Sequence, residues 1–346
     1  MKRRDFLKGN IMRTGNGLSF VFVGLLFFSL PARAEEAKEI RVGIIGLDAH
    51  GLPFTQILND PQKSGDLAGV RVVAAFPGGS PDVPTSRTLL ANSIEPVRKL
   101  GVEIVDSIDD VLRKGDAVLI LSIDGRKHLE QAQATIAARK PFFVDKPVAA
   151  TLVDAVRIFE LARQAGVPCF SSSSLRYSQG FYGMRDNQAV GQVLGCDAYG
   201  PNSPLEPSHP DLFYYGIHGT ELLFTIMGPG CVSVSRVRAD NADFVVGQWQ
   251  DGRVGTFRGI RAGATGFGAT VFGAKGIAAA GKFEGYAQLL VEIARFFKTG
   301  RPPLEVEQTL EIYAFMEAAD ESKRQGGGPV TLESVLAKAR ATAGAK

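Results

Sequence analysis

The chain has 346 residues, of which 45% are hydrophobic and 22% are charged, enough for two ordinary domains with packed cores. The formal net charge is +3, but residues 1–34 alone hold six Lys or Arg and one acid, so the remainder has 33 basic and 35 acidic residues. This balance, without Lys and Arg clustered among aromatic residues, argues against a nucleic-acid-binding protein. Three widely spaced cysteines, Cys169, Cys196 and Cys231, argue against a disulfide framework or a zinc knuckle.

The first 34 residues have the three parts of a signal peptide. "KRRDFLKG" is a charged start, "LSFVFVGLLFFSL" is an apolar stretch, and "ARA" is a small-x-small cleavage site before Glu35. Arg3 and Arg4 resemble a twin-arginine export signal, although Lys2 stands where that signal prefers Ser or Thr. The apolar stretch is too short for a comfortable membrane span. We therefore predict an exported, periplasmic protein with no stable membrane span; an uncleaved N-terminal anchor is the alternative.

Strands and helices alternate in the next part of the chain. Continuous apolar runs predict strands, and helical spacing of apolar residues predicts the helices between them. The expected strands are 40–47, 70–76, 102–106, 117–123 and 141–147, and the expected helices are 52–60, 85–101, 108–115 and 126–140. This alternation is typical of βαβ units around a parallel sheet. We predict an α/β fold whose N-terminal Rossmann-like domain covers residues 35–147.

A second domain follows, with a different pattern. It opens with a helix, "TLVDAVRIFELARQAG", and a strand, "VPCFSSSS", and from about residue 190 it turns to β-rich runs joined by Gly and Asp turns. Asp251-Gly252 is a hairpin signal. Two helices, "YAQLLVEIARFFKTG" and a longer one from residue 302, come last. We predict an α+β domain with an open antiparallel sheet over residues 148–330, and a loose C-terminal tail at 331–346.

The turn after the first strand, "GLDAHG", is close to the G-x-G-x-x-G loop that holds the pyrophosphate of a dinucleotide. Gly46, Leu47, Asp48 and Gly51 are the candidate cofactor contacts in this turn. Asp48 stands where the fingerprint has its middle glycine. The carboxylate need not face phosphate, because an Asp can cap the following helix and so occupy the amides that would bind the anion.

The end of the second strand also departs from the dinucleotide pattern. It reads "AAFPGGSPD", without the acid that grips a ribose 2′-hydroxyl. Ser80 and Arg87 downstream would suit a 2′-phosphate instead, so the sequence leaves NAD and NADP both open.

Lys146 and His218 are the main candidate catalytic residues. Lys146 ends a strand directly before a proline, so its ammonium is expected near the ligand crevice beyond the carboxyl ends of the strands; a structural lysine paired with Asp145 is the alternative. A histidine such as His218 can take the proton of a hydroxyl, because its pKa lies near neutral. In the expected helix, which "SHPD" would start, Tyr214 and His218 are four residues apart and share a face. A helix histidine that only packs is the alternative for His218.

Other polar residues follow strands that end at the same crevice. Asp124 and His128 come after the strand at 117–123, and Arg176 comes after "SSSS". Asp124, Arg176 and His209 are candidate substrate contacts, although Arg176 would also suit a salt bridge between the domains. The chain has four histidines without paired metal-ligand spacing, so we predict no metal site.

The order of these motifs resembles the Gfo/Idh/MocA oxidoreductases, the family of glucose–fructose oxidoreductase and inositol dehydrogenase. The resemblance runs from about residue 39 to 330 and includes the ending "FFKTGRPPLEVEQTLEIYAFMEAADES". It implies that Lys146, in "DKP", matches the E-K-P lysine that contacts the nicotinamide and the substrate hydroxyl. It also implies that His128 lies beside the nicotinamide ribose and that His218 is the catalytic histidine. The family usually has an acid where this chain has Tyr214.

The resemblance implies NAD(P)-dependent hydride transfer on a sugar or polyol, with His218 moving the proton and Lys146 polarising the oxygen. Tyr214 would bind the substrate or act as an acid. Two alternatives remain open: a lyase or hydrolase of keto-sugars without net redox, and a degenerate sugar-binding protein whose Asp48 closes the dinucleotide site. Because relatives commonly pair through the open sheet face, the resemblance also suggests a homo-oligomer.

Overall fold

The computed structural model describes residues 39–202 and 211–344. The predicted signal peptide at 1–34 and the candidate residue His209 lie outside the described residues.

The first sheet is parallel and has six strands in the order β3-β2-β1-β4-β5-β6. Its strands are β1 (Ile40–Ile45), β2 (Val70–Phe76), β3 (Glu103–Ile104), β4 (Ala117–Ile120), β5 (Phe142–Val144) and β6 (Cys169–Phe170). This is the strand order of a Rossmann fold, in which the order of the strands reverses between β1 and β4 and leaves a crevice at their carboxyl ends.

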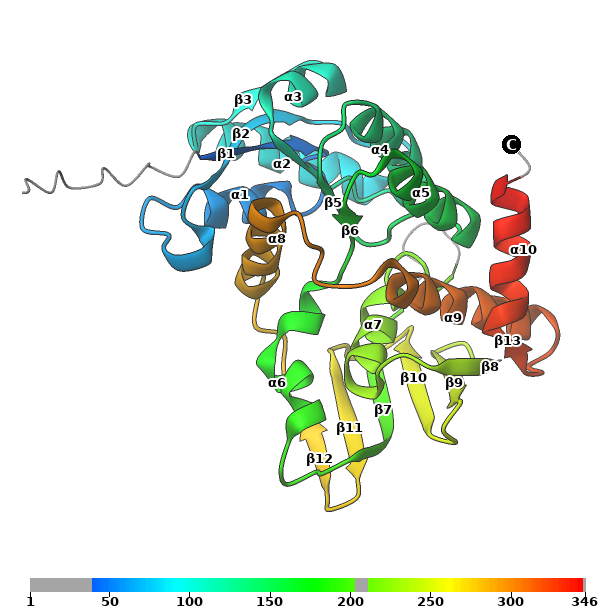
Figure 1. Cartoon of the computed structure of the whole chain (residues 1–346). Coiled ribbons are helices and arrows are strands. Elements are labelled where there is room, and N and C mark those ends of the chain that lie inside the picture. The colour runs from blue at the N-terminus through cyan, green and yellow to red at the C-terminus, as the bar shows by residue number, and fades with distance from the viewer. Residues whose placement is uncertain (1–38, 203–210, 345–346) are drawn as a thin grey trace, which may run out of the picture. The chain divides into compact units, whose positions relative to one another are not determined.

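Helices cover both faces of this sheet (Figure 1). One face packs against α1 (Gly51–Leu58), α2 (Pro84–Lys99) and α8 (Ala287–Thr299), and the other against α3 (Ile108–Lys114), α4 (His128–Ala137) and α5 (Leu152–Ala165). Successive residues of β1 face opposite sides, so Ile44 enters one core and Ile45 the other. The continuous apolar runs in the sequence therefore reflect strands that are buried on both faces.

The second sheet has seven strands in the order β12-β11-β7-β10-β9-β8-β13. It is antiparallel except for the parallel pair β7–β10. The strands are β7 (Val193–Pro201), β8 (Cys231–Arg238), β9 (Ala242–Trp249), β10 (Val254–Ile260), β11 (Gly268–Gly273), β12 (Ile277–Ala280) and β13 (Val330–Thr331). The helices of this part are α6 (Gln179–Tyr182), α7 (Gly216–Met227), α9 (Val306–Arg324) and α10 (Leu332–Gly344). The predicted fold class, a Rossmann-like domain followed by an α+β domain, is confirmed.

Among the described residues, helices cover one face of the second sheet. α7 and α9 pack against it, and Val245 of β9 points into that core. Its neighbours Phe244 and Val246 point the other way and are exposed, as are Val237 and Ile277, whose side chains are 65% and 69% exposed. The outer face of this sheet is thus an open surface with many apolar side chains.

Two predicted boundaries differ from the structure. The first sheet continues past the predicted domain boundary at residue 147, because β6 pairs with β5 and α5 packs in the same core. The predicted loose tail at 331–346 is wrong for the part that the structure describes, since α10 buries Leu332, Val335 and Ala339. Apolar residues at helical spacing tie this end of the chain to α5 and α9.

The three cysteines are buried and unpaired, and burial raises the pKa of each thiol. Within the described ranges, no helix combines the length and the apolar character that a membrane crossing needs.

Candidate active site

A cleft of about 440 Å³ lies where the carboxyl ends of β1, β4 and β5 meet the second domain. Both domains contribute to its walls, so the cleft depends on their contact. It is lined by Ala49, His50, Pro53, Thr85, Leu89, Ile123, Lys146, Ser174, Leu175, Tyr214, Tyr215, His218, Phe267, Phe283 and Tyr286. Five aromatic rings and three basic side chains surround the cleft, which is the mixed lining of a small-molecule site.

Lys146 follows the end of β5 and is buried in the cleft wall. Its Nζ lies 5.6 Å from the centre of the Tyr215 ring, in a cation–π contact. Among the described residues no carboxylate lies within ion-pair distance of Nζ, and burial lowers the pKa of Lys146 although Asp145 acts in the opposite direction. The ammonium is therefore held on one side by a ring and is open to the cleft on the other.

His218 lies in the first turn of α7 and faces the same cleft as Lys146. Its Nδ1 is 2.8 Å from the Ser173 hydroxyl, and its ring makes edge contacts with Tyr215 and Phe267. Burial, together with the positive charge of Lys146, holds the pKa of His218 well below its usual range. The structure thus brings Lys146 and a neutral His218 together, with the Tyr215 ring between them.

Ser173 is held by a carboxylate from the same helix that carries His218. Glu221 of α7 accepts hydrogen bonds from the Ser173 amide at 2.8 Å, the Ser172 hydroxyl at 2.5 Å and the Arg176 Nε at 2.7 Å. These bonds fix the segment after β6 against α7. Ser172 and Ser173 of the "SSSS" segment therefore hold α7 and the imidazole of His218 in place, whereas Ser174 lines the cleft.

The prediction that Tyr214 and His218 share a helix face is wrong. α7 begins at Gly216, and the residues from 211 to 215 form turns. Both Tyr214 and Tyr215 reach the cleft, but Tyr215 is the tyrosine in contact with both Lys146 and His218. Position 214, where the resembled family usually has an acid, lies in the turn before α7 and is Tyr214 here.

Asp48 is fully buried and does not line the cleft. Its carboxylate accepts hydrogen bonds from the Ser86 hydroxyl and, at 3.1 Å, from the Ile123 amide, and burial raises its pKa. The N-cap of α1 is His50, which makes no side-chain capping bond. The prediction that Asp48 caps this helix is therefore wrong: the side chain joins the turn to α2 and to the loop after β4.

Asp124 does not reach the cleft. Its buried carboxylate accepts from the Ser80 hydroxyl at 2.6 Å and from the Arg126 guanidinium, which also pairs with Asp82. These contacts tie the loop after β2 to the loop after β4, so Asp124 is structural rather than a substrate contact. Arg87, proposed for a 2′-phosphate, bonds the Pro81 carbonyl.

His128 is fully buried. Its Nε2 lies 2.8 Å from the Ser122 carbonyl and its Nδ1 lies 2.8 Å from the Pro147 carbonyl. Burial lowers its pKa. The expected cofactor contact is therefore replaced by a structural role, in which His128 joins the loop after β4 to the segment that follows Lys146.

Arg176 faces away from the cleft. Besides its ion pair with Glu221, it lines a separate polar cavity of about 450 Å³ together with Arg185 and Glu292. Arg176 was a candidate substrate contact, with a salt bridge between the domains as the alternative; the structure instead pairs it with Glu221 of α7 at 2.7 Å and does not place it in the cleft wall.

The sequence analysis missed a histidine–carboxylate pair in the cleft. His50 Nδ1 lies 2.6 Å from Asp145 Oδ2, with the His50 side chain 17% exposed and Asp145 buried. The His50 ring stacks on Phe54, with centres 5.2 Å apart and 7° between planes, and also contacts Tyr286. Two signals were available: a histidine directly before Gly51 in the cofactor turn, and an acid directly before Lys146.

Within residues 39–202 and 211–344, no group of three or more His, Cys, Asp or Glu side chains is arranged to hold a metal ion.

The fold and the cleft define a class of two-domain proteins in which a Rossmann domain and an α+β domain enclose a site beyond the parallel strands. Residues 40–173 match the family model described as "Oxidoreductase family, NAD-binding Rossmann fold". The N-terminal part of the chain is therefore similar to the Gfo/Idh/MocA oxidoreductases, over a match that covers less than half of the chain.

Known relatives extend this match. Inositol 2-dehydrogenase of Paracoccus denitrificans is 31% identical over 160 residues, which cover 45% of this chain and 43% of that enzyme, so the match spans less than half of the relative. A putative myo-inositol dehydrogenase from Sinorhizobium meliloti superposes with a TM-score of 0.70 at 18% identity, over 85% of this chain and 99% of that one. Myo-inositol dehydrogenase from Lactobacillus casei, solved with NAD(H) and myo-inositol, superposes with a TM-score of 0.67 at 17% identity. The superposition covers 84% of this chain and 96% of that one. These two likenesses concern the fold.

The residues where the crevice meets the cleft, in the turn between β1 and α1, fit a dinucleotide. Gly46 has a φ of +96°, and a Cβ there would lie 2.5 Å from the Ser122 amide nitrogen, so the tight turn is kept. Ala49 and His50, at the N-terminus of α1, border the cleft, and the carboxylate of Asp48 is turned away from it. The first turn of α1 would hold the phosphates and Lys146 would lie at the nicotinamide.

The end of the crevice beside β2 lacks the residue that usually binds the adenosine ribose. β2 is followed by Pro77, Gly78 and Gly79, where the fingerprint has an acid for the adenosine ribose. The adenosine half of a dinucleotide would therefore be held by fewer polar contacts than the nicotinamide half.

Proposed function

We propose that this protein is an NAD(P)-dependent oxidoreductase that oxidises a secondary alcohol of a sugar or polyol, or reduces the matching ketone. The observation that carries the proposal is the meeting of Lys146 and His218 in one cleft, next to the N-terminus of α1. The match of residues 40–173 to an NAD-binding oxidoreductase family, and relatives named inositol 2-dehydrogenase, support the reaction class and the substrate class.

The bound nicotinamide supplies the carbon that exchanges hydride with the substrate. Lys146 donates hydrogen bonds to the reacting oxygen and stabilises the negative charge that develops as its proton leaves; such a donor is most effective in a site shielded from water. An imidazole at the cleft accepts that proton. The rings of Tyr215, Phe267 and Tyr286 shield the site from water and suit the C–H faces of a carbohydrate.

The test combines binding and turnover. Calorimetry with NAD and with NADP should give saturable binding to at least one of them, and reduced nicotinamide should appear when inositols or aldoses are added. Absence of binding at saturating concentrations of both dinucleotides would overturn the proposal. The comparison of the two titrations also decides the cofactor preference, since neither the end of β2 nor Arg87 presents a free ribose-recognition group.

We further propose that the protein is exported through its twin-arginine-like signal and acts in the periplasm. Such export carries folded proteins, which fits a cofactor loaded before translocation. N-terminal sequencing of protein recovered from the periplasm should begin at Glu35. Recovery of the uncleaved chain in the membrane fraction would contradict this assignment.

We also propose that two copies pair through the open face of the second sheet. The exposed apolar residues of β8 and β9, among them Val237 and Val246, support this surface. Light scattering should give a dimer for the natural chain and a monomer for Val246→Glu. A natural chain that is monomeric at high concentration would contradict the pairing.

A further inference from the structure

We propose that His50, oriented by Asp145, takes the substrate proton in the cleft, and that His218 instead donates a hydrogen bond to the substrate oxygen. The reaction itself rests on the proposed function. The protonation pattern of the two imidazoles, however, follows from the contacts of this chain and is testable without turnover.

Asp145 fixes the tautomer of His50. An ionised carboxylate only accepts hydrogen bonds, so the 2.6 Å contact with Oδ2 requires a proton on His50 Nδ1. Burial alone would raise the pKa of Asp145, but His50 and Lys146 outweigh it and lower the pKa, so the carboxylate stays charged. Its other oxygen accepts from the Lys146 amide at 2.8 Å. In neutral His50 the lone pair is therefore on Nε2.

The ring of His50 is held at the edge of the cleft. The His50 ring stacks parallel on Phe54, and its centre lies 4.9 Å from the centre of the Tyr286 ring. These contacts restrict its rotation, while part of the side chain stays exposed to the cleft. A buried carboxylate behind a histidine stabilises the imidazolium that forms when the ring takes a proton. His50 thus has the two requirements of a general base, a free lone pair and a negative partner.

His218 lacks both requirements of a general base, the free lone pair and the negatively charged partner. The Ser173 hydroxyl accepts a bond from the Leu175 amide at 3.3 Å and has one proton to donate, which we assign to the 2.8 Å contact with His218 Nδ1. The Nε2 of neutral His218 then carries the proton and donates. No carboxylate supports the ring from position 214, which is Tyr214 here.

The two roles balance the reaction. A bound nicotinamide would accept the electron pair of the substrate C–H bond as hydride, while the substrate O–H bond breaks and its proton goes to His50 Nε2. The carbon–oxygen double bond forms from the electrons of the O–H bond. Lys146 and His218 donate hydrogen bonds to that oxygen throughout, and both remain protonated.

Nitrogen-15 NMR of histidine-labelled protein tests the tautomers directly. The chain has only four histidines, so His50→Gln and His218→Gln variants assign the two signals. At a pH where both rings are neutral, long-range correlations should show the proton on Nδ1 of His50 and on Nε2 of His218. In Asp145→Asn the preference of His50 should be lost, because an amide can also donate; the exposed Asp106→Asn should leave it unchanged. A proton on Nε2 of His50 in the natural chain would overturn the proposal.

Kinetics at saturating cofactor separate this inference from the proposed function. His50→Gln should lower kcat by about 10²–10⁴-fold, and His218→Gln should lower it by about tenfold. A His50→Gln variant within about twofold of the natural kcat would refute the role of His50 as base. If the natural chain turns over no alcohol, the proposed function fails, and the NMR result still decides which imidazole carries a free lone pair.

Discussion

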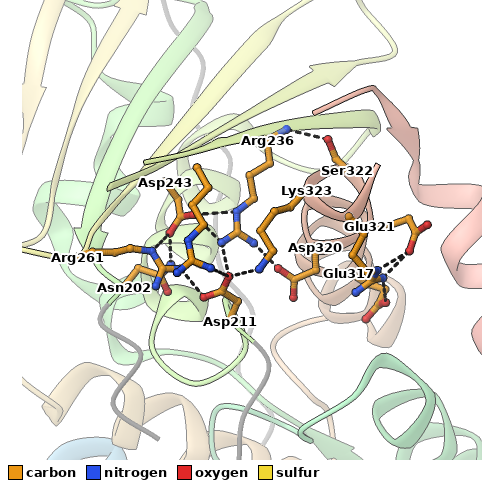
Figure 2. A network of polar contacts seen from close by, with 12 residues as sticks. Asn202, Asp211, Arg236, Asp243, Arg261, Glu317, Asp320, Glu321, Ser322 and Lys323 are labelled. Atoms are coloured by element: carbon orange, nitrogen blue, oxygen red, sulfur yellow. Dashed lines mark hydrogen bonds and ion pairs between the residues drawn. The ribbon is translucent and has the colours of Figure 1, made fainter. Parts of the chain in front are cut away.

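Two sites of buried charge in the described part of the chain are built differently. In the second domain, Arg236, Arg261 and Lys323 surround Asp211, Asp243 and Asp320, and each of these side chains has an oppositely charged partner (Figure 2). In the cleft, Lys146 has an aromatic ring on one side and no carboxylate within ion-pair distance among the described residues. The difference teaches where chemistry is possible: a charge that is fully paired holds segments together, whereas one left open to a cavity can act on a ligand.

The first cluster also supports the second. The Arg236 guanidinium lies 2.8 Å from Asp211 and 2.6 Å from Asp243, and Arg261 and Lys323 reach Asp211 as well. Asp211 opens the turn that leads to Tyr215 and α7. The paired charges therefore fix the segment from which the cleft takes its aromatic wall and His218.

The largest effect is expected where the paired cluster loses its centre. Arg236→Met leaves three carboxylates near one another in a buried site, so the free energy of unfolding should fall by about 3–5 kcal/mol in chemical denaturation. The matched control is Arg238→Met on the same strand, whose side chain is 46% exposed; it should cost less than about 1 kcal/mol. Equal losses in the two variants would contradict the central role of Arg236.

Removal of the open charge should act on the reaction and not on the fold. Lys146→Met should lower kcat/KM by about 10²–10³-fold, because a donor to the reacting oxygen is lost, while the unfolding transition stays or rises as the desolvated charge disappears. The exposed Lys99→Met serves as control and should keep full activity. Unchanged kcat/KM in Lys146→Met would remove Lys146 from the mechanism.

The paired cluster should also give a pH dependence of stability. Burial raises the pKa of Asp320 from 3.8 to about 6, despite the opposing charge of Arg236. The folded state then binds the proton more tightly than the unfolded chain, so the free energy of unfolding should fall by about 1–3 kcal/mol as the pH rises from about 4 to about 6. In denaturant titrations across this pH range, the free energy of unfolding should change less with pH in Asp320→Asn than in the natural chain. An equal slope in both proteins would show that another group titrates.

The smallest effect is expected at the support of His218. Ser173→Ala removes the partner of Nδ1, so kcat should fall by about tenfold and the ring should lose its tautomer preference in NMR spectra. Ser171→Ala in the same segment is the control. Retention of the Nε2-protonated tautomer in Ser173→Ala would mean that the ring contacts alone orient His218.

The sequence predicts the fold well because its signals are local. Apolar runs such as 40–47 mark strands buried on both faces, and helical spacing marks α9 and, in retrospect, α10. Lys146 and His218 were found because each lies in a short motif. The pair of His50 and Asp145 joins positions 95 residues apart, so no spacing rule indicates it.

The remaining errors have the same origin. Tyr214 was placed on a helix because "SHPD" was expected to start it, whereas residues 211–215 form turns, in which Asp211 makes ion pairs. Asp124, His128 and Arg176 follow strand ends as expected, but each finds a buried partner that turns it from the cleft. Position along a strand predicts the neighbourhood of a side chain, and only the tertiary contacts decide its direction.

The carboxylate of Asp48 has a consequence for protein engineering. Because it bonds both Ser86 and Ile123, a glycine introduced to rebuild the standard fingerprint would release two loops from the turn instead of opening room for a phosphate. Such a variant would melt at a lower temperature and gain no affinity for dinucleotide. A tighter cofactor grip would have to be designed at the far end of the crevice, where Gly78 and Gly79 leave the ribose without an acidic partner.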